Sequence, residues 1–411
     1  MMHVILSRGI AMGSKKVKYL SSACVVLGFL IPFVASKFIG MPLGAMPLIS
    51  AATIILWTIG ILLSYFAYID IRKPPPSLPS WVTISNFIAS DPSRYLMFGI
   101  MFGYLYYPSV EKSLVPTFGP YLLMVIMFSM GLAISFKDWK GMVQRPKMVG
   151  IGVLLRWLCM PFVAFLLSLV LIQLFPGATG KTLAVGLIIL GTTPTGGGSN
   201  ALTMISGGDL ALSVSVTSIN TIIAPFIQPL LILWLAGSMA NLNAGAIFRD
   251  LFWMVVVPVV VGSIFGSIFQ KSISKIKPAL GPIAVICLAF IIMGTMSKGT
   301  STLIKQFSIL LYLVVVCVFQ AVAGLFLGYF LPKYFGFNYK QRKAICFEVG
   351  VENAAMAMLV ALRHFSPLAA LPSIVYGKIQ YIIGSTIVVP KFQRIEDKEV
   401  IKTPSAEGVR A

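Results

Sequence analysis

Long apolar runs alternate with short polar loops along almost the whole chain. Because a helix of about 20 predominantly apolar residues crosses the hydrocarbon core of a bilayer, each run of that order predicts a membrane span. Twelve runs qualify, at 18–38, 45–69, 95–110, 118–136, 148–173, 182–206, 210–236, 247–269, 279–297, 307–331, 341–363 and 371–389. The pattern therefore predicts an all-α polytopic membrane protein.

Two of the expected spans are interrupted near their centres. Span 182–206 contains 191-GTTPTGGGSN-200, and span 341–363 contains 347-FEVGVENAA-355. Glycine and proline release backbone groups from the helical ladder, and in lipid such groups need protein, water or an ion as a partner. A mere kink needs only one glycine, whereas the first interruption has four, with three threonines, Ser199 and Asn200. We therefore expect a polar binding site at two broken helices.

The last ten spans divide into two halves of five. An odd number of spans gives the halves opposite topology, and the interruptions then fall in the fourth span of each half. A GxxxG motif also recurs in the first span of each half, at 99–103 and 262–266. The expected domains are two extra N-terminal helices (1–70), a linker (71–94), a transporter fold (95–389) with inverted repeats at about 95–236 and 247–389, and a polar cytoplasmic tail (390–411).

Composition and charge agree with a membrane protein. The chain is 58% hydrophobic and 11% charged, with a mean hydropathy of +0.92, whereas a soluble domain has about 25% charged residues. The net charge of +20 does not indicate nucleic-acid binding, because the basic residues lie in short clusters in alternate loops. Such clusters mark the cytoplasmic side, so both termini are expected there, in the cell inner (plasma) membrane. The first span ends in 34-VAS-36, so a cleaved signal peptide is an alternative to an uncleaved span.

Charged side chains inside the expected spans are candidates for function. A carboxylate at the membrane centre costs at least about 2.5–3.5 kcal/mol and is functional by default. Glu348 and Glu352 are spaced to share one helical face. A structural ion pair is the alternative, because Arg156 and Lys378 also lie inside spans.

A stripe of polar residues accompanies the first interruption. Ser213, Thr217 and Asn220 recur at positions i, i+4 and i+7 of the following span, which places them on one helical face. Each could instead form a helix–helix hydrogen bond. Together with the interruption and Glu348 they supply the oxygen atoms that hard cations prefer.

No motif indicates catalysis. The stretch 177-GATGKT-182 resembles a phosphate-binding loop, but Phe175 occupies the position of the first glycine and no strand is expected before it. A metal-binding His/Asp cluster and a nucleophile motif are both lacking in the sequence. We therefore expect neither enzymatic activity nor binding of a nucleotide or a nucleic acid.

The chain resembles the bile acid:sodium symporter family over about 95–389. The residues that carry the resemblance are 197-GGSN-200, 211-ALSVSVTS-218, 346-CFEVGVENAAMA-357 and 121-YLLMVIMFSMGLAIS-135. The resemblance implies a ten-helix inverted repeat with core and panel domains, two crossing broken helices, two sodium sites and an organic anion bound nearby. The two N-terminal helices are extra to that pattern.

The resemblance also implies site residues, position by position. The first sodium site would be formed by Ser199, Asn200, Ser213, Thr217 and Glu348. The second cation site would be altered, because relatives have glutamine where this chain has Arg156 and Glu352; its other members would be Val349 and Val351. Substrate-binding positions would be Gly197, Gly198, Asn353, Gln380 and Tyr381, where Gln380 and Tyr381 replace a typical His-Asn pair. Lys378, which is new relative to the family pattern, is a further substrate-binding candidate.

These observations predict a secondary active transporter for a small organic anion. We expect sodium-coupled symport by alternating access, with one sodium site retained and the second replaced by an Arg156–Glu352 pair. A proton-coupled or uncoupled anion carrier is the first alternative, and a membrane ligand sensor or a channel is the second. Sodium would be the coupling ion, with no other metal and no cofactor.

Overall fold

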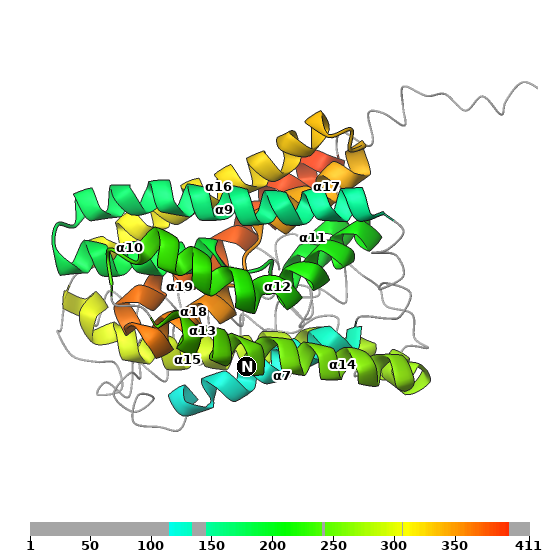
Figure 1. The fold of residues 1–411 in the computed structure, drawn as a ribbon, viewed down its shortest axis with the longest axis horizontal. Helices are drawn as coiled ribbons and strands as arrows, with labels where there is room; N and C mark the ends of the chain where they lie inside the picture. Colours follow the sequence, from blue (N-terminus) through cyan, green and yellow to red (C-terminus); the bar gives the residue numbers. More distant parts are fainter. Residues whose placement is uncertain (1–114, 134–144, 241–242, 306, 394–411) are drawn as a thin grey trace, which may run out of the picture. The chain divides into compact units, whose positions relative to one another are not determined.

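The computed structural model describes residues 115–133, 145–240, 243–305 and 307–393, and the regular elements in these ranges are helices (Figure 1). Their bounds are α7 Val115–Ala133, α9 Pro146–Leu174, α10 Ala178–Gly191, α11 Gly198–Ile205, α12 Leu210–Ala236, α13 Ala244–Leu251, η2 Phe252–Val256, α14 Val257–Ile268, α15 Gln270–Lys305, α16 Phe307–Tyr334, α17 Tyr339–Gly350, α18 Ala354–His364, α19 Pro367–Ile383 and η3 Gly384–Val388. The expected spans 18–38, 45–69 and 95–110, the linker and residues 394–411 of the tail lie outside the described residues.

Several described helices have the length and composition of membrane spans. Five qualify among the described residues: Pro146–Leu174, Leu210–Ala236, Ala244–Ile268, Gln270–Thr295 and Ile309–Tyr334. Shorter apolar helices cover Thr117–Leu132, Ala178–Gly191 and Ala354–His364. These elements agree with the helices expected from the apolar runs, and the protein is an integral, multi-pass membrane protein.

The long helix α9 has apolar residues on its exposed face and polar residues on its buried face. Leu154, Leu158 and Phe162 recur every four residues and are all exposed, whereas Arg156 and Ser168 on the other face are fully buried. In a soluble protein the distribution is reversed, with the polar face towards solvent. Lipid therefore suits the exposed face of α9, and the polar chemistry lies inside the protein.

The described helices belong to two compact units. One unit includes α7 up to Ser129 and α15 from Lys271 onward, and the other includes the remaining described helices. In the second unit α9 runs alongside α16, and α19 packs against α10, α16 and α18 (Figure 1). Glycine permits the closest approaches, since a Cβ atom added to Gly186 would lie 2.0 Å from the carbonyl oxygen of Ala369. All candidate site residues discussed below lie in the second unit.

Both expected interruptions are present as helix breaks. The first separates α10 from α11 at residues 192–197, and the second separates α17 from α18 at residues 351–353. Asn338 is the N-cap of α17 and forms a capping box with Gln341. The helix ends at Gly350, so the last turn, which carries Glu348, has a defined position.

The two breaks cross and hydrogen-bond to each other through their backbones. Thr195 and Glu352 form an isolated antiparallel bridge. Next to it, the Gly196 amide donates to the Val351 carbonyl at 3.1 Å, and the Asn353 amide donates to the Pro194 carbonyl at 3.0 Å. Backbone groups that the breaks release from the helices therefore form hydrogen bonds with one another, as a membrane interior requires.

Candidate functional site

The Glu348 carboxylate lies at the centre of a cluster of side-chain oxygens beside the crossing. It accepts hydrogen bonds from Ser199 Oγ at 2.7 Å, Ser213 Oγ at 2.6 Å and Thr217 Oγ1 at 2.8 Å. Asn200 Oδ1 lies 2.8 Å from Ser213 Oγ and 3.4 Å from Thr217 Oγ1. The structure thus brings together the five residues that the resemblance implies for a first sodium site.

Three separate elements hold this cluster, which we call the Glu348 cluster. Ser199 and Asn200 are in the first turn of α11, Glu348 is in the last turn of α17, and the other two residues are on α12. The start of α12 is fixed by its N-cap, Asp209, whose carboxylate accepts from the Leu212 amide at 3.0 Å. The spacing of four residues on α12 then places both hydroxyls on the face towards Glu348.

The Glu348 cluster contains more hydrogen-bond acceptors than hydrogens. Ser213 Oγ lies within 3.2 Å of Glu348, Asn200 and Thr203 oxygens, but a hydroxyl has one hydrogen and donates to one acceptor at a time. Among described residues, no lysine, arginine or histidine pairs with the buried Glu348 carboxylate. A small, hard cation is the ligand that such a set of oxygens suits.

Additional polar residues support the cluster on the side of the first break. The Thr195 hydroxyl donates to the Glu348 carbonyl at 2.8 Å. The Asn220 amide nitrogen donates to Thr195 Oγ1 at 3.3 Å, while its oxygen accepts from Trp157 Nε1 at 2.9 Å. This chain of contacts links α9 and α12 to the backbone of α17. The helical stripe in the sequence pointed to Asn220, whereas no pattern singled out Trp157 as its partner.

A second buried charge group lies at the crossing, and it is an ion pair. The Arg156 guanidinium forms a two-pronged contact with the Glu352 carboxylate, and the Arg156 Nη1–Glu352 Oε1 distance is 3.3 Å. The same guanidinium reaches the Thr193 carbonyl at the first break and lies 3.5 Å from the Val349 carbonyl near the second. Thr193 Oγ1 is 3.0 Å from Glu352. Arg156 therefore contacts oxygens of both broken helices.

The positions implied for substrate binding fall into two groups. Asn353 and Gln380 are buried and bonded to backbone: Asn353 Oδ1 accepts from the Met356 amide at 3.2 Å, and the Gln380 side chain pairs with the Glu352 amide and carbonyl at 2.7 and 3.1 Å. These two side chains hold the second break in shape.

The second group is more accessible. Gly197 is exposed, and Gly198, Lys378 and Tyr381 are half-buried. A Cβ atom added to Gly198 would lie 2.4 Å from the Tyr381 ring, so the glycine is needed for this close contact. Gly197, Gly198 and Tyr381 thus lie at the start of α11, which also carries Ser199 and Asn200 of the Glu348 cluster.

Lys343 ends the basic stretch 340-KQRK-343 at the start of the expected span 341–363, and the structure places it inside the protein. Lys343 is on α17, fully buried, and its ammonium donates to the Ser206 carbonyl at 2.7 Å. The ammonium also lies 4.5 Å from the centre of the Tyr339 ring. Ser206 is the C-cap of α11, and a cation is favourable at a helix C-terminus. Lys343 therefore ties α17 to the end of α11.

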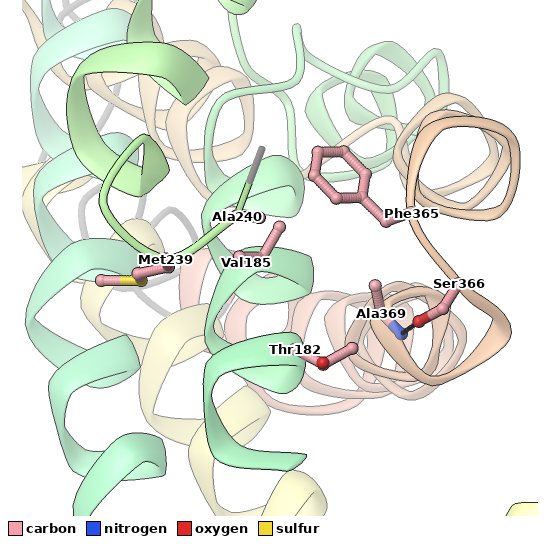
Figure 2. Close-up of a pocket in the computed structure, with 7 residues that line it drawn as sticks. All are labelled: Thr182, Val185, Met239, Ala240, Phe365, Ser366 and Ala369. Carbon is pink, nitrogen blue, oxygen red and sulfur yellow. Dashed lines mark hydrogen bonds between the residues drawn. The ribbon is translucent and has the colours of Figure 1, made fainter. Parts of the chain in front are cut away.

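A pocket of about 210 Å³ lies away from the Glu348 cluster (Figure 2). It is lined by residues at the start of α10, after α12 and at the start of α19: Thr182, Val185, Met239, Ala240, Phe365, Ser366 and Ala369. Its surface is about equally polar and apolar, and Ser366 Oγ accepts from the Ala369 amide at 3.3 Å as an N-cap. None of the expected site residues lines this pocket.

Comparisons with known proteins agree with this architecture. A model of the Sodium Bile acid symporter family matches residues 120–306. The chain is 33% identical over 275 residues to the Bacillus subtilis (strain 168) protein "Uncharacterized sodium-dependent transporter YocS", covering 67% of this chain and 83% of that protein.

Plant relatives match over a similar length. "Probable sodium/metabolite cotransporter BASS1, chloroplastic" of Arabidopsis thaliana is 29% identical over 313 residues, covering 76% of each chain. "Probable sodium/metabolite cotransporter BASS2, chloroplastic" of Oryza sativa subsp. japonica is 31% identical over 323 residues, covering 77% of this chain and 74% of the relative. The chain therefore belongs to the Sodium Bile acid symporter family and is a multi-pass membrane transporter, not an enzyme.

Proposed function

We propose that this protein is a secondary active transporter that couples the entry of sodium to the movement of a small organic anion by alternating access. The observation that carries the proposal is the Glu348 cluster, in which one buried carboxylate meets three hydroxyls and an amide oxygen. The printed names of the relatives, a sodium-dependent transporter and sodium/metabolite cotransporters, support sodium as the ion.

Sodium bound in the Glu348 cluster would stabilise one arrangement of three elements. The five oxygen-bearing residues come from α11, α12 and α17, so a shared ion draws these elements together. The ion also neutralises Glu348, whose charge is otherwise costly at this depth. Binding of the ion thereby prepares the crossing for the anion, which is the energetic basis of symport.

The positive ends of two half-helices support an anionic substrate. Both α11, which begins at Gly198, and α18, which begins at Ala354, start at the crossing. Helix N-termini favour negative charge, and transporters use them in this way. We propose that the anion binds near Gly197, Gly198, Tyr381 and Lys378, with Asn353 and Gln380 shaping the break beneath it.

The second cation position is proposed to be filled by the protein itself. Arg156 contacts carbonyl oxygens of both breaks together with the Glu352 carboxylate. A fixed guanidinium among these oxygens repels a mobile cation, since like charges a few Å apart interact strongly where water is excluded. We therefore propose one coupled sodium ion, held by the Glu348 cluster. A proton-coupled carrier with the Arg156–Glu352 pair as its switch is the second candidate.

The order of the helices supports the proposed inverted repeat. A long helix, a broken helix and a further helix follow one another as α9, α10–α11 and α12, and again as α16, α17–α18 and α19. We propose the same domain limits as the sequence predicts, repeats at about 95–236 and 247–389. We further propose that the protein lies in the plasma membrane with both termini on the cytoplasmic side.

Uptake into proteoliposomes tests this function. Purified protein is reconstituted, and uptake of radiolabelled organic anions (steroid conjugates, pantothenate-like acids and keto acids) is measured with an inward gradient of sodium, of potassium or of protons. We expect uptake of at least one anion that the sodium gradient alone drives. Uptake driven by the proton gradient and indifferent to sodium would favour the second candidate. Binding without flux would indicate a sensor.

A further inference from the structure

Two buried polar side chains lie at the contact between α16 and α19 without a partner among the described residues. Gln320 on α16 and Ser373 on α19 are both 0% exposed, and neither the Gln320 amide nor the Ser373 hydroxyl has a hydrogen-bond partner there. Other buried hydroxyls in this unit bond to their own helix, as Ser218 does to the Val214 carbonyl at 2.8 Å. Unpaired polar groups are rare inside proteins, and a bound water is one of the arrangements that satisfies them.

Contacts on either side of Gln320 and Ser373 place the two residues at one level. Cys317 Sγ lies 3.6 Å from the Pro372 carbonyl, one turn before Gln320 on α16 and one residue before Ser373 on α19. In the other direction both helices reach Gly350. A Cβ atom added to Gly324, one turn after Gln320, would lie 3.0 Å from Gly350 Cα, and Tyr376 Oη, one turn after Ser373, donates to the Gly350 carbonyl at 2.9 Å. Gln320 and Ser373 therefore lie at the same level between α16 and α19.

The chemistry of the two side chains indicates a small neutral ligand. The amide offers donors on Nε2 and an acceptor on Oε1, and the hydroxyl offers one donor and two acceptor positions. A mixed set of this kind suits water, which makes about 3 hydrogen bonds at buried sites. A metal cation would leave the amide hydrogens unpaired, and it would also be repelled by Arg156 at the neighbouring crossing.

We propose that Gln320 and Ser373 hold a buried water between α16 and α19, about one helical turn from Gly350, where α17 ends. This site is distinct from the Glu348 cluster and does not depend on which ion drives transport. The proposed water lies close to the second break on the side of α19. On the same side the Tyr376 hydroxyl donates to the Gly350 carbonyl, which the break releases from the helix.

Hydroxyl-radical labelling by X-ray radiolysis, read out by mass spectrometry, tests the proposal on the intact protein. Buried side chains are labelled only where a water molecule lies beside them. The chain has a matched pair of reporters, because Cys317 and Cys346 are 0% and 1% exposed and both thiols donate to a backbone carbonyl. We expect several-fold faster labelling of Cys317. Equal labelling of the two cysteines, whether fast or slow, overturns the proposal.

Variants then assign the water to the two side chains. Gln320→Leu combined with Ser373→Ala should reduce the labelling of Cys317 to the rate of Cys346. If both side chains bind one water, the combined fall in the thermal unfolding midpoint should be smaller than the sum of the single falls. Gln320→Leu with Ser218→Ala is the control pair and should be additive. A rise in the midpoint on either single change overturns the proposal, because removing an unsatisfied polar group from a dry site is stabilising.

Discussion

Arg156 on α9 and Glu352 in the second helix break form a buried ion pair, whereas Glu348, four residues before Glu352, is surrounded by hydroxyls. Two carboxylates of one broken helix thus have opposite surroundings. The charge of Glu352 is neutralised by the protein. The charge of Glu348 is left for a ligand to neutralise, and the difference leads to distinct predictions for the two residues.

Removing oxygen ligands from the Glu348 cluster should remove the dependence on sodium. We expect Glu348→Gln, Asn200→Ala and Thr217→Val each to raise the sodium concentration for half-maximal uptake at least about tenfold, which corresponds to a loss of about 1.4 kcal/mol in binding. Thr217→Ser keeps the hydroxyl and should behave like the wild type. The measurement is anion uptake against sodium concentration in proteoliposomes.

The matched control for these variants is Ser215→Ala. The Ser215 hydroxyl donates to the Ala211 carbonyl of its own helix at 2.8 Å and does not contact Glu348. Sodium dependence should therefore be unchanged. If all three cluster variants respond to sodium as the wild type does, the assignment of the sodium site to this cluster is wrong.

Breaking the Arg156–Glu352 pair on one side should destabilise the protein more than removing both charges. Arg156→Gln alone or Glu352→Gln alone leaves one buried charge without its partner, which typically costs about 3–5 kcal/mol. The double variant replaces both charges by amides and should recover most of the loss. Thermal unfolding in detergent, with and without sodium, measures the coupling. Additive losses in the double variant would contradict a direct pair.

The wild-type protein should transport one sodium ion with each substrate molecule. Because Arg156 occupies the oxygens at the second break, the wild type should give a sodium-to-substrate ratio of one. The ratio follows from the membrane potential at which net flux reverses in proteoliposomes with known gradients. A measured ratio of two would show that the guanidinium does not exclude a second cation.

The substrate should be recognised through its negative charge. The N-termini of α11 and α18 lie at the crossing and favour an anion, and Lys378 on α19 is proposed to add a positive charge. For a transported acid and its matched neutral amide, calorimetric titration in the presence of sodium should show at least about tenfold weaker binding of the amide, or about 1.4 kcal/mol. Equal affinity for acid and amide would rule out recognition by charge.

The crossing of the two breaks should tolerate no side chain at Gly196. A Cβ atom there would lie 2.6 Å from the Glu352 carbonyl oxygen, so Gly196→Ala should destabilise the protein by roughly 1–3 kcal/mol and reduce transport. Gly150→Ala in α9 is the control, since nothing lies within 4 Å of its added Cβ. That change should stabilise the helix by about 0.5–1 kcal/mol. The measurement is the thermal unfolding midpoint of the Gly196→Ala and Gly150→Ala variants. Equal midpoints for the two variants would argue against a tight crossing.

Local sequence signals predicted the helix breaks, whereas the five members of the Glu348 cluster were expected from the family resemblance, position by position. Glycine and proline identify a break, and the four-residue spacing of Ser213 and Thr217 places them on one face of α12. The charges inside the expected spans left the pairing of Arg156 open, and the family resemblance singled out Glu352 as its partner. The glycine and proline signals and the four-residue spacing need no knowledge of how distant segments pack.

Other features depend on contacts between distant segments, and the sequence did not indicate them. The bridge between Thr195 and Glu352 joins residues from different broken helices. Gln320 and Ser373 are flanked on both sides by apolar residues, and no periodic pattern includes them. The basic stretch 340-KQRK-343 gave no sign that Lys343 is buried, and its burial depends on the packing of α17 against α11 and on the ring of Phe392.

The joint between the two broken helices is made of main-chain atoms: the Gly196 amide with the Val351 carbonyl, and the Asn353 amide with the Pro194 carbonyl. These hydrogen bonds use backbone amide and carbonyl groups, so residues outside the crossing take no part in them. The side chains proposed to face the substrate, at Tyr381 or Lys378 for instance, can therefore be exchanged while the crossing of the two breaks is kept. A few substitutions at such positions can then change the transported substrate without changing the transport mechanism.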